Sequence, residues 1–178
     1  EPEWVLGIRI TYSKQEGTLS LCQDSYIKLL LEKNQMLDCK GAPTPMSQER
    51  LTIETCPKTE EERAEVRKLC SNYRSMVACL IWIAGNTRPD ISYAVSELSR
   101  YLENPGKAQI TALRRVYRYL KHTMTKSITY RRNRSELQQS PVIEGWCDAD
   151  WGGDVDTYKS TTGYLYMMCG GPIAWKSK

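Results

Sequence analysis

The sequence has no phenylalanine, a single histidine and no cysteines spaced as Cys-x-x-Cys. With His122 as its one imidazole, the chain is not expected to build a zinc site from several histidines or paired thiolates. The seven cysteines are scattered and odd in number, so we interpret them as reduced intracellular thiols and not as a disulfide framework. There is no long apolar run and no charged-then-apolar start, so neither a membrane span nor a signal peptide is predicted.

The charges that are present divide the chain unevenly. The 178 residues suit one domain or two small ones, and 40% hydrophobic residues are enough to build a core. Between Pro105 and Ser135 there are nine lysines or arginines and no acid, whereas residues 136–156 hold six acids and no cation. This pattern indicates either two sites with different tasks or two solvated faces that adjoin. Because the first residue is Glu1, we expect a fragment or a processed product.

The first half of the chain predicts a hairpin, a helix and a connection. "WVLGIRITYSKQEGTLSLCQ" alternates apolar and polar residues on both sides of a turn that contains Gly17, which predicts a β-hairpin. "QDSYIKLLLEKNQM" has apolar residues at helical spacing. Residues 37–72 contain "GAPTPM" and the charged run "TEEERAEVRK", and are interpreted as a connection in which the charged run starts a solvated helix.

Residues 73–135 are strongly helical in pattern. "YRSMVACLIWIAGN" predicts a buried helix that ends near Gly85, and "TRPDISYAVSELSRYLE" predicts a second helix, with Thr87 and Asp90 as a capping box. A third predicted helix has the apolar stripe Ile110, Leu113, Val116, Tyr117 and Leu120.

Cations occupy the opposite face of that third helix. They cover roughly a third of its circumference. These cations would favour the binding of a polyanion, because each phosphate that is neutralised releases condensed counterions. The alternative is a solvated surface that is partly paired with acids elsewhere. His122 is interpreted as a helix-end residue and not as a catalyst. The predicted nucleic-acid contacts are Arg114, Arg115, Arg118, Lys121, Lys126, Arg131 and Arg132.

The last section predicts three antiparallel strands in "VIEGWCDADW", "STTGYLYMM" and "GGPIAWKSK". Asp148 and Asp150 are two residues apart, so in a regular strand they point to the same face, where carboxylates could bind Mg²⁺. The spacing is not that of a calcium loop. Read by itself, the motif also fits the polar end of a strand.

Several blocks resemble one family in order and spacing. "YRSMVACLIWIAGNTRPDISYAVSELSRYL", "RRVYRYLKHT" and "CDADWGGDVDTYKSTTGYLYMMCGGPIAWKSK" are similar to the Pol polyprotein of copia-type retrotransposons, as are "WVLGIRI", "LSLCQDSYIKLLLEKNQM" and "APTPM". The resemblance covers nearly the whole chain. It implies an α+β fold with an N-terminal β-hairpin, a thumb-like helical bundle and a partial ribonuclease H-like sheet of three antiparallel strands.

The resemblance also implies roles. Residues 1–36 would be a primer-grip-like hairpin and helix, residues 37–72 a linker, residues 73–135 thumb and connection-like helices, and residues 136–178 the start of a ribonuclease H-like domain. Trp4, Leu6 and Gly7 would belong to the primer grip. Asp148 resembles the first metal-binding aspartate of ribonuclease H, with Asp150 the less favoured candidate, and Mg²⁺ is the implied cofactor.

The implied function is that of a fragment of an RNA-directed DNA polymerase with ribonuclease H activity, which grips an RNA–DNA hybrid or template–primer duplex. Its partners would include the rest of the polyprotein, with no membrane, in a cytoplasmic particle or the nucleus. The paired aspartates of the polymerase site and the later ribonuclease H glutamate are absent, and Gln109 stands where relatives carry a histidine. We therefore expect the chain alone to be inactive. The alternatives are a non-catalytic relic that acts as a nucleic-acid-binding or interaction module, and a decayed copy that folds poorly.

Overall fold

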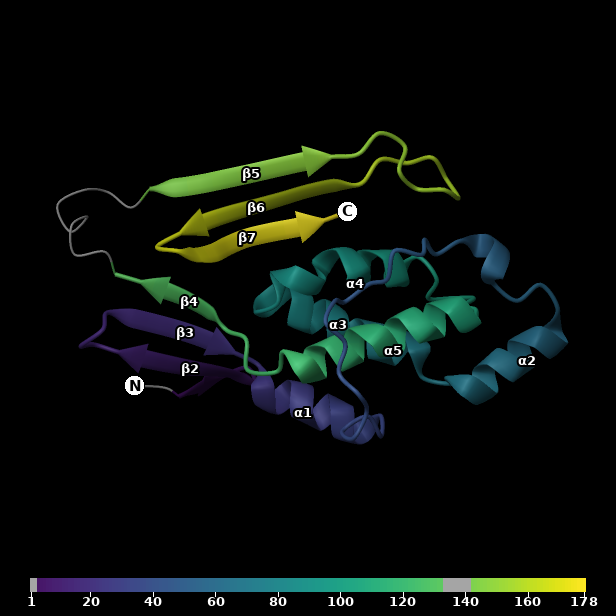
Figure 1. Ribbon diagram of the computed structural model, residues 1–178, viewed down its shortest axis with the longest axis horizontal. Coiled ribbons are helices and arrows are strands. Elements are labelled where there is room, and N and C mark those ends of the chain that lie inside the picture. The colour runs from purple at the N-terminus through teal and green to yellow at the C-terminus, as the bar shows by residue number, and fades with distance from the viewer. Residues whose placement is uncertain (1–2, 133–141) are drawn as a thin grey trace.

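The chain forms a helical body with two antiparallel sheets, which confirms the predicted α+β class (Figure 1). The computed structural model describes residues 3–132 and 142–178, so the domain boundary predicted at 135/136 lies outside the described residues. The strands are β1 (Trp4–Val5), β2 (Ile8–Ser13), β3 (Thr18–Cys22), β4 (Ile128–Arg131), β5 (Ile143–Ala149), β6 (Thr162–Met168) and β7 (Gly171–Ser177). The helices are α1 (Asp24–Lys33), α2 (Glu60–Leu69), α3 (Tyr73–Asn86), α4 (Ser92–Ser99) and α5 (Lys107–His122), with the 3-10 turns η1 (Ile53–Thr55) and η2 (Pro89–Ile91).

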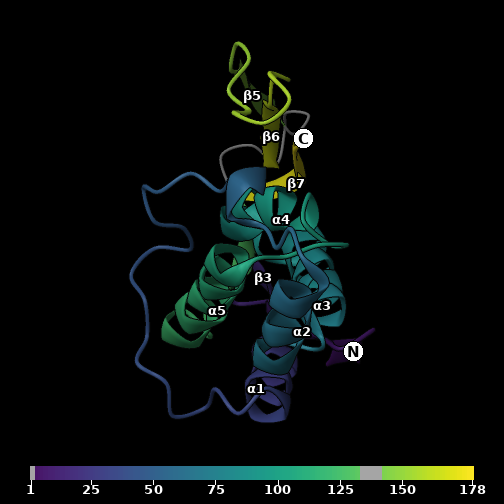
Figure 2. The same cartoon turned by 90° about the vertical axis from the view of Figure 1, so that its right-hand side faces the viewer.

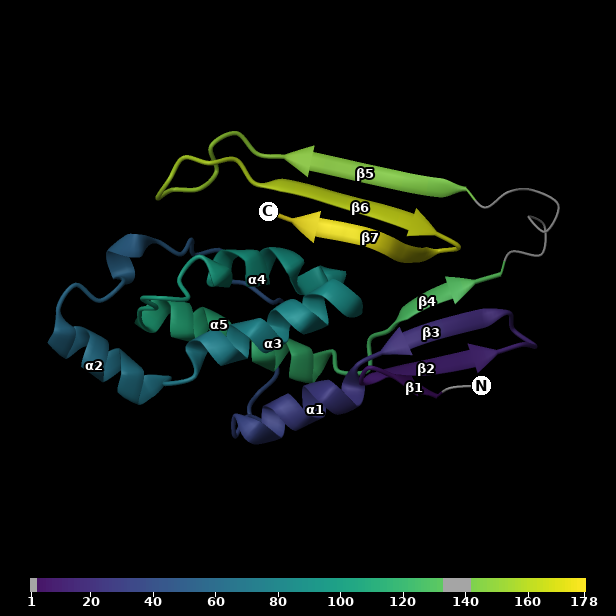
Figure 3. The same ribbon diagram turned by 180° about the vertical axis from the view of Figure 1, so that it is seen from behind.

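The first sheet has the strand order β1-β2-β3-β4. Its central hairpin turns at Gly17, whose φ of 64° needs the freedom of glycine, as the sequence predicts. The alternating run before it is not one strand, because Leu6 and Gly7 both have positive φ and form a tight turn between β1 and β2. Strand β4 was not predicted. It pairs with β3, where Thr18 faces Arg131, and lies beside the turn between β6 and β7 (Figure 3).

The core lies among α1, α3, α4 and α5. Leu113 and Val116 of the predicted α5 stripe are fully buried and pack with α3 residues such as Leu80 and Ile83. Burying one side chain of this size contributes about 1.5 to 3 kcal/mol, so the stripe fixes which face of α5 points inward. Its cationic face therefore points outward, as predicted.

Helix starts were only partly predictable. The charged run does begin α2, and Thr59 and Glu62 form a capping box there. The capping box predicted from Thr87 and Asp90 is wrong. Thr87 donates to Gln23 Oε1 at 2.7 Å, and the Asp90 carboxylate accepts hydrogen bonds from Arg88. The guanidinium of Arg88 is buried and pairs with the Asp90 carboxylate, so this carboxylate is not available to cap the helix.

Gln109, which stands where relatives of the resembling family carry a histidine, joins α5 to η1. Its side chain is fully buried, accepts from the Gly106 amide at 3.0 Å and donates to the Thr52 carbonyl at 3.0 Å. A Cβ on Gly106 would lie 2.1 Å from the carbonyl oxygen of Thr55, so only glycine fits this junction. Gln109 is thus a structural cap in this chain.

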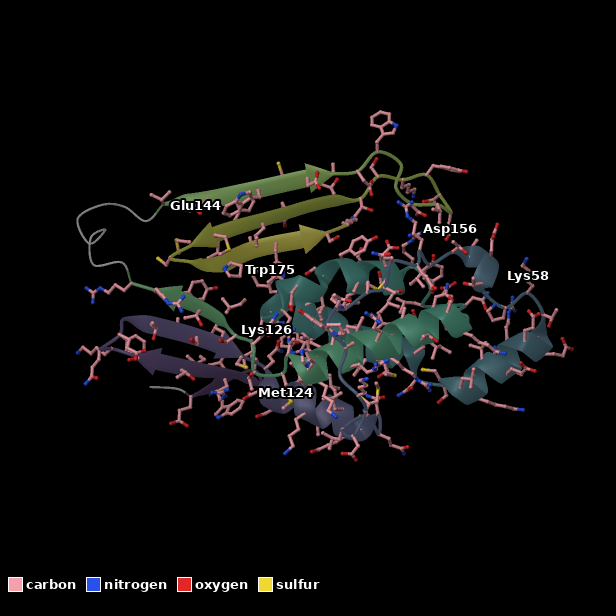
Figure 4. The ribbon with its side chains drawn as sticks, viewed as in Figure 1. Lys58, Met124, Lys126, Glu144, Asp156 and Trp175 are labelled. Atoms are coloured by element: carbon pink, nitrogen blue, oxygen red, sulfur yellow. The ribbon has the colours of Figure 1, made fainter. Side chains whose placement is uncertain are left out.

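The second sheet is the predicted meander, with the order β5-β6-β7. It stands on edge above the helices, with β7 next to α4 (Figure 2). Trp175 of β7 points toward the helical body and donates its indole N–H to the Ala84 carbonyl at 2.7 Å (Figure 4). The sheet packs against the helical body along its β7 edge, and every residue of β5, at the opposite edge, is exposed.

Candidate nucleic-acid interface and carboxylate strand

The cationic face of α5 is partly covered by the chain itself. Each of its four cations donates a hydrogen bond to a neutral oxygen. These bonds are Arg114 Nη2 to Leu69 O at 3.0 Å, Arg115 Nη2 to Thr44 Oγ1 at 2.8 Å, Arg118 Nε to Lys40 O at 2.7 Å and Lys121 Nζ to Cys39 O at 2.5 Å. Three of the four acceptors belong to residues 39–44, which we call the strap.

The strap runs along the outer side of α5, in the connection that the sequence assigned no task (Figure 2). Ala42 is 1% exposed, and its amide donates to the Arg118 carbonyl at 3.2 Å. In the described part of the chain none of the four α5 cations forms an ion pair with an acid. Nε of Arg115 is buried and has no hydrogen-bond partner there. The strap therefore satisfies some donors without neutralising any charge.

The remaining predicted cations lie beyond the end of α5. Lys126 is exposed and lies over the ring of Tyr119, 5.7 Å from its centroid (Figure 4). Arg131 and Arg132 are exposed at the end of β4 and line a hollow of about 450 Å³ that also includes Glu144. The structure thus divides the predicted patch into a strap-covered group on α5 and an open group from Lys126 to Arg132.

The predicted primer-grip residues form the turn at the N-terminal edge of the first sheet. Leu6 is 78% exposed at the tip of this turn, and Trp4 is half-exposed beside it. A hollow of about 780 Å³ on the sheet is lined by Trp4, Arg9 and Tyr12, among others. The side chain of Arg9 bonds Asp24 at 2.6 Å, and this bond lowers the pKa of Asp24 below its ordinary value. Trp4, Leu6 and Gly7 therefore lie together and are accessible.

The two candidate metal-binding aspartates differ in their surroundings. Asp148 is exposed on β5 opposite Gly163, and no side-chain hydrogen bond engages it in the described residues. Asp150 follows the strand, and its Oδ1 accepts from the Thr161 amide at 2.6 Å and from the Gly153 amide at 3.4 Å. Asp150 therefore closes the loop of residues 150–161, which we call the acidic loop. Asp148 keeps its lone pairs available.

The other acids of this loop bind the helical body. Asp154 and Asp156 both pair with Arg100 of the α4 C-terminus, and Asp156 also accepts from the Tyr101 hydroxyl at 2.9 Å. The Ile53 amide donates to both Asp156 oxygens at 3.0 Å, and Figure 4 shows Asp156 pointing from the loop toward the body. Sequence reasoning missed this cluster, since Arg100 lies far from the loop in sequence and its spacing carries no signal.

Electrostatics within the cluster follow from these contacts. Burial raises the pKa of Asp154, but hydrogen bonds from Thr157, from backbone amides and the charge of Arg100 outweigh it and hold the pKa below its ordinary value. Burial and the hydrogen bond to Asp156 raise the pKa of Tyr101. Asp154 is thus held as a carboxylate, and both Asp154 and Asp156 are already engaged by protein groups, which leaves them poorly placed to bind a metal.

The described residues do not make a complete Mg²⁺ site. No group of three or more His, Cys, Asp or Glu side chains lies close enough to hold a metal in residues 3–132 and 142–178. Asp148 would supply one open carboxylate and Asp150 one that already binds loop amides, whereas Mg²⁺ needs near-octahedral oxygen ligation.

The seven cysteines are all free thiols. Among the described residues no helix is both long and apolar enough to cross a membrane.

Comparison with known proteins gives clear relatives. The chain is 37% identical to the retrovirus-related Pol polyprotein from transposon TNT 1-94 of Nicotiana tabacum over 98% of its own length and 13% of that protein. It is 35% identical to the one from transposon RE1 of Arabidopsis thaliana over 100% of its length and 11% of that protein. It is 32% identical to an uncharacterized mitochondrial protein of Arabidopsis thaliana, AtMg00810, over 98% of its length and 66% of that protein. No model of a known protein family and no solved structure matches it.

Two of these relatives are Pol polyproteins of transposons. The chain is homologous to retrovirus-related Pol polyproteins from transposons, and it corresponds to a short segment of them, about an eighth or less of the length of the two Pol polyproteins described above.

Proposed function

We propose that the chain is the segment of a copia-type reverse transcriptase–ribonuclease H that carries the thumb-like and connection-like helices and the start of the ribonuclease H-like sheet, and that it grips template–primer nucleic acid. The observation that carries this proposal is the 37% identity to a Pol polyprotein over 98% of the chain. Its partners would be an RNA–DNA hybrid or template–primer duplex and the rest of the polyprotein, inside a cytoplasmic particle or the nucleus.

Two accessible regions support nucleic-acid contact. The open cations Lys126, Arg131 and Arg132 can pair with backbone phosphates, which releases counterions. The exposed turn around Leu6 offers an apolar contact to a primer end. Both regions would position a duplex and not read its sequence, because phosphate and sugar contacts carry no base information.

A binding experiment tests this proposal. Fluorescence anisotropy with a labelled RNA–DNA hybrid should show binding that weakens steeply as salt rises. The double variant Arg131→Glu/Arg132→Glu should bind several-fold more weakly and show a salt slope smaller by about 2. Lys28→Glu/Lys33→Glu is the matched control, because it reverses two charges on α1, away from β4. Equal affinity of the two double variants would show that the open cations do not contact the nucleic acid.

Catalysis is proposed to belong to the whole polyprotein. A two-metal cut requires carboxylates on both sides of the scissile phosphate, and Asp148 with Asp150 supplies only part of such a set. The isolated chain should therefore neither polymerise nor cleave an RNA–DNA hybrid in Mg²⁺. Detectable Mg²⁺-dependent cleavage by the pure chain that disappears in Asp148→Asn would contradict this.

A second candidate function is that of a stand-alone nucleic-acid-binding or interaction module derived from such an element. The observation in its favour is AtMg00810, of which the chain covers 66% and which is therefore far shorter than a Pol polyprotein. Sequencing the transcript on both sides of this chain separates the two. An open frame with a paired-aspartate motif upstream and a ribonuclease H glutamate downstream favours the polyprotein, whereas a stop codon or unrelated exons favour the module.

A further inference from the structure

We propose that the strap, residues 39–44, is a built-in competitor for the anion site on α5, so that a polyanion reaches Arg115, Arg118 and Lys121 only by displacing it. The inference deepens the proposed function and rests on it for the identity of the polyanion, a nucleic-acid backbone. The competition itself depends only on the chemistry of the strap and the helix.

The strap presents the same type of atom that a phosphate would present. Carbonyl oxygens of Cys39 and Lys40 accept from Lys121 Nζ and Arg118 Nε, and the Thr44 hydroxyl accepts from Arg115 Nη2. A phosphodiester offers these donors a charged oxygen, which adds the attraction of opposite charges that a neutral carbonyl or hydroxyl oxygen does not supply. The donors therefore bind the strap less strongly than they would bind a polyanion.

The strap leaves one hydrogen-bond donor and the positive charges of the α5 face without partners among the described residues. Nε of Arg115 is buried without a partner in the described residues, and a buried donor that makes no hydrogen bond is unfavourable. No described acid pairs with any of the three cations that the strap contacts. Both features favour exchange of the strap for a ligand that brings negative charge.

The strap is also fixed by contacts that do not involve cations. Ala42 is buried, and its amide donates to the Arg118 carbonyl. Leu37 before the strap and Met46 after it pack against the core. These anchors oppose displacement, so the strap sets a threshold of polyanion charge below which the α5 face stays covered.

A disulfide lock provides the first test. A Cβ on Gly41 would lie 3.0 Å from the Cβ of His122, so cysteines at both positions can be joined after a shift of about half an ångström. The oxidised Gly41→Cys/His122→Cys variant should elute from heparin at lower salt than the same protein reduced. Its salt slope for an RNA–DNA hybrid should be smaller by about 3, and its affinity several-fold lower. Wild type carried through the same oxidation, with mass spectrometry of the cross-link, controls for the native thiols.

A variant designed to loosen the strap tests the opposite effect, an increase in binding. Ala42→Gln introduces a side chain too large for its buried position, so the strap should lift and both heparin retention and hybrid affinity should rise several-fold. Ser47→Gln, on an exposed residue just beyond the strap, is the matched control and should leave both unchanged.

The outcomes separate the two proposals. If the lock weakens heparin retention while no form binds the hybrid, the competing strap is supported and the nucleic-acid function fails. Equal heparin retention and hybrid affinity of the oxidised and reduced lock would overturn the strap as a competitor, even if wild type binds the hybrid well. Tighter binding by the oxidised lock would also overturn it, since the strap would then be part of the site.

Discussion

At the scale of single residues, Arg88 is the most deeply buried charged side chain that the structure describes. It is 1% exposed, and its guanidinium donates to Asp90 at 2.9 and 2.8 Å and to the Thr123 carbonyl at 3.0 Å. Asp90 also accepts from the Tyr119 hydroxyl at 2.7 Å. One ion pair thus connects η2 to the C-terminal end of α5, where the positive charge also faces the last carbonyls of the helix.

Removing the acid from this pair should destabilise the protein. Asp90→Asn leaves the buried guanidinium of Arg88 without its countercharge, and we expect a loss of about 2 kcal/mol in the free energy of unfolding. The value is below that of a fully buried pair because the side chain of Asp90 is 31% exposed. Urea denaturation followed by circular dichroism measures it. Asp38→Asn, at an exposed acid for which no ion pair is found among the described residues, should change little.

The same pair predicts how stability depends on pH. Partial burial raises the pKa of Asp90, but the hydrogen bonds and charge of Arg88 outweigh this and hold it below its ordinary value in the folded protein. A carboxyl with a lowered folded-state pKa contributes stability above its unfolded pKa of about 4 and loses it as pH falls through the folded value. The difference in unfolding free energy between wild type and Asp90→Asn should therefore shrink between about pH 5 and pH 2. A difference that stays constant over this range would contradict the assignment.

At the scale of elements, two glycines in helical surroundings should respond in opposite ways to alanine. A Cβ on Gly106 would lie 2.1 Å from the Thr55 carbonyl oxygen, which is backbone and cannot move away cheaply. Gly106→Ala should therefore cost about 2 kcal/mol by overpacking where α5 begins. Gly85, near the end of α3, has open space within 4 Å of its Cβ position, so Gly85→Ala should stabilise by up to about 1 kcal/mol. Urea midpoints of the two variants that shift in the same direction would refute this contrast.

Elements with a long internal pattern could be predicted from the sequence. The helices around residues 24–33, 73–86 and 107–122 show their own periodicity, and burial follows it. The last three strands also lie where their residue types predict them, although every residue of β5 is exposed. Strand β4 has only four residues, and its partner β3 is about a hundred residues away, so no local pattern marks it. The break at Leu6 was missed because a non-glycine residue adopts positive φ there.

The charged residues of the candidate site could be predicted from the sequence, whereas the groups that they contact could not. Helical spacing alone places Arg114 and Arg118 on the outer face of α5, because side chains three to four residues apart share a face. It gives no sign that carbonyls of the strap lie over them, since every residue carries a carbonyl and no pattern marks the ones that are used. Likewise the spacing of Asp148 and Asp150 does not reveal that only Asp150 binds the loop amides.

At the scale of the whole molecule, the acidic loop joins the second sheet to the helical body at one end, as Trp175 does in its middle. Among the described strands of this sheet, β7 makes the most extensive contact with the helical body. Asp156 accepts from Tyr101 and from the Ile53 amide, so one carboxylate connects the loop to both α4 and η1. The orientation of the strand that carries Asp148 therefore depends on a contact well outside that strand.

Weakening the contact between the acidic loop and the helical body should change the hydrogen exchange of one backbone amide, that of Ile53. In Asp156→Ala the Ile53 amide loses both of its acceptors, so its hydrogen exchange should become at least tenfold faster, because protection of an exposed turn depends on that bond. Amides within β6, which bond to neighbouring strands, should keep their rates. Asp148→Asn is the matched control, since it alters an acid of the same region that makes no described side-chain bond. Unchanged exchange at Ile53 would mean that the loop does not hold the sheet to the body, and faster exchange across all of β6 would mean that Asp156 stabilises the sheet itself.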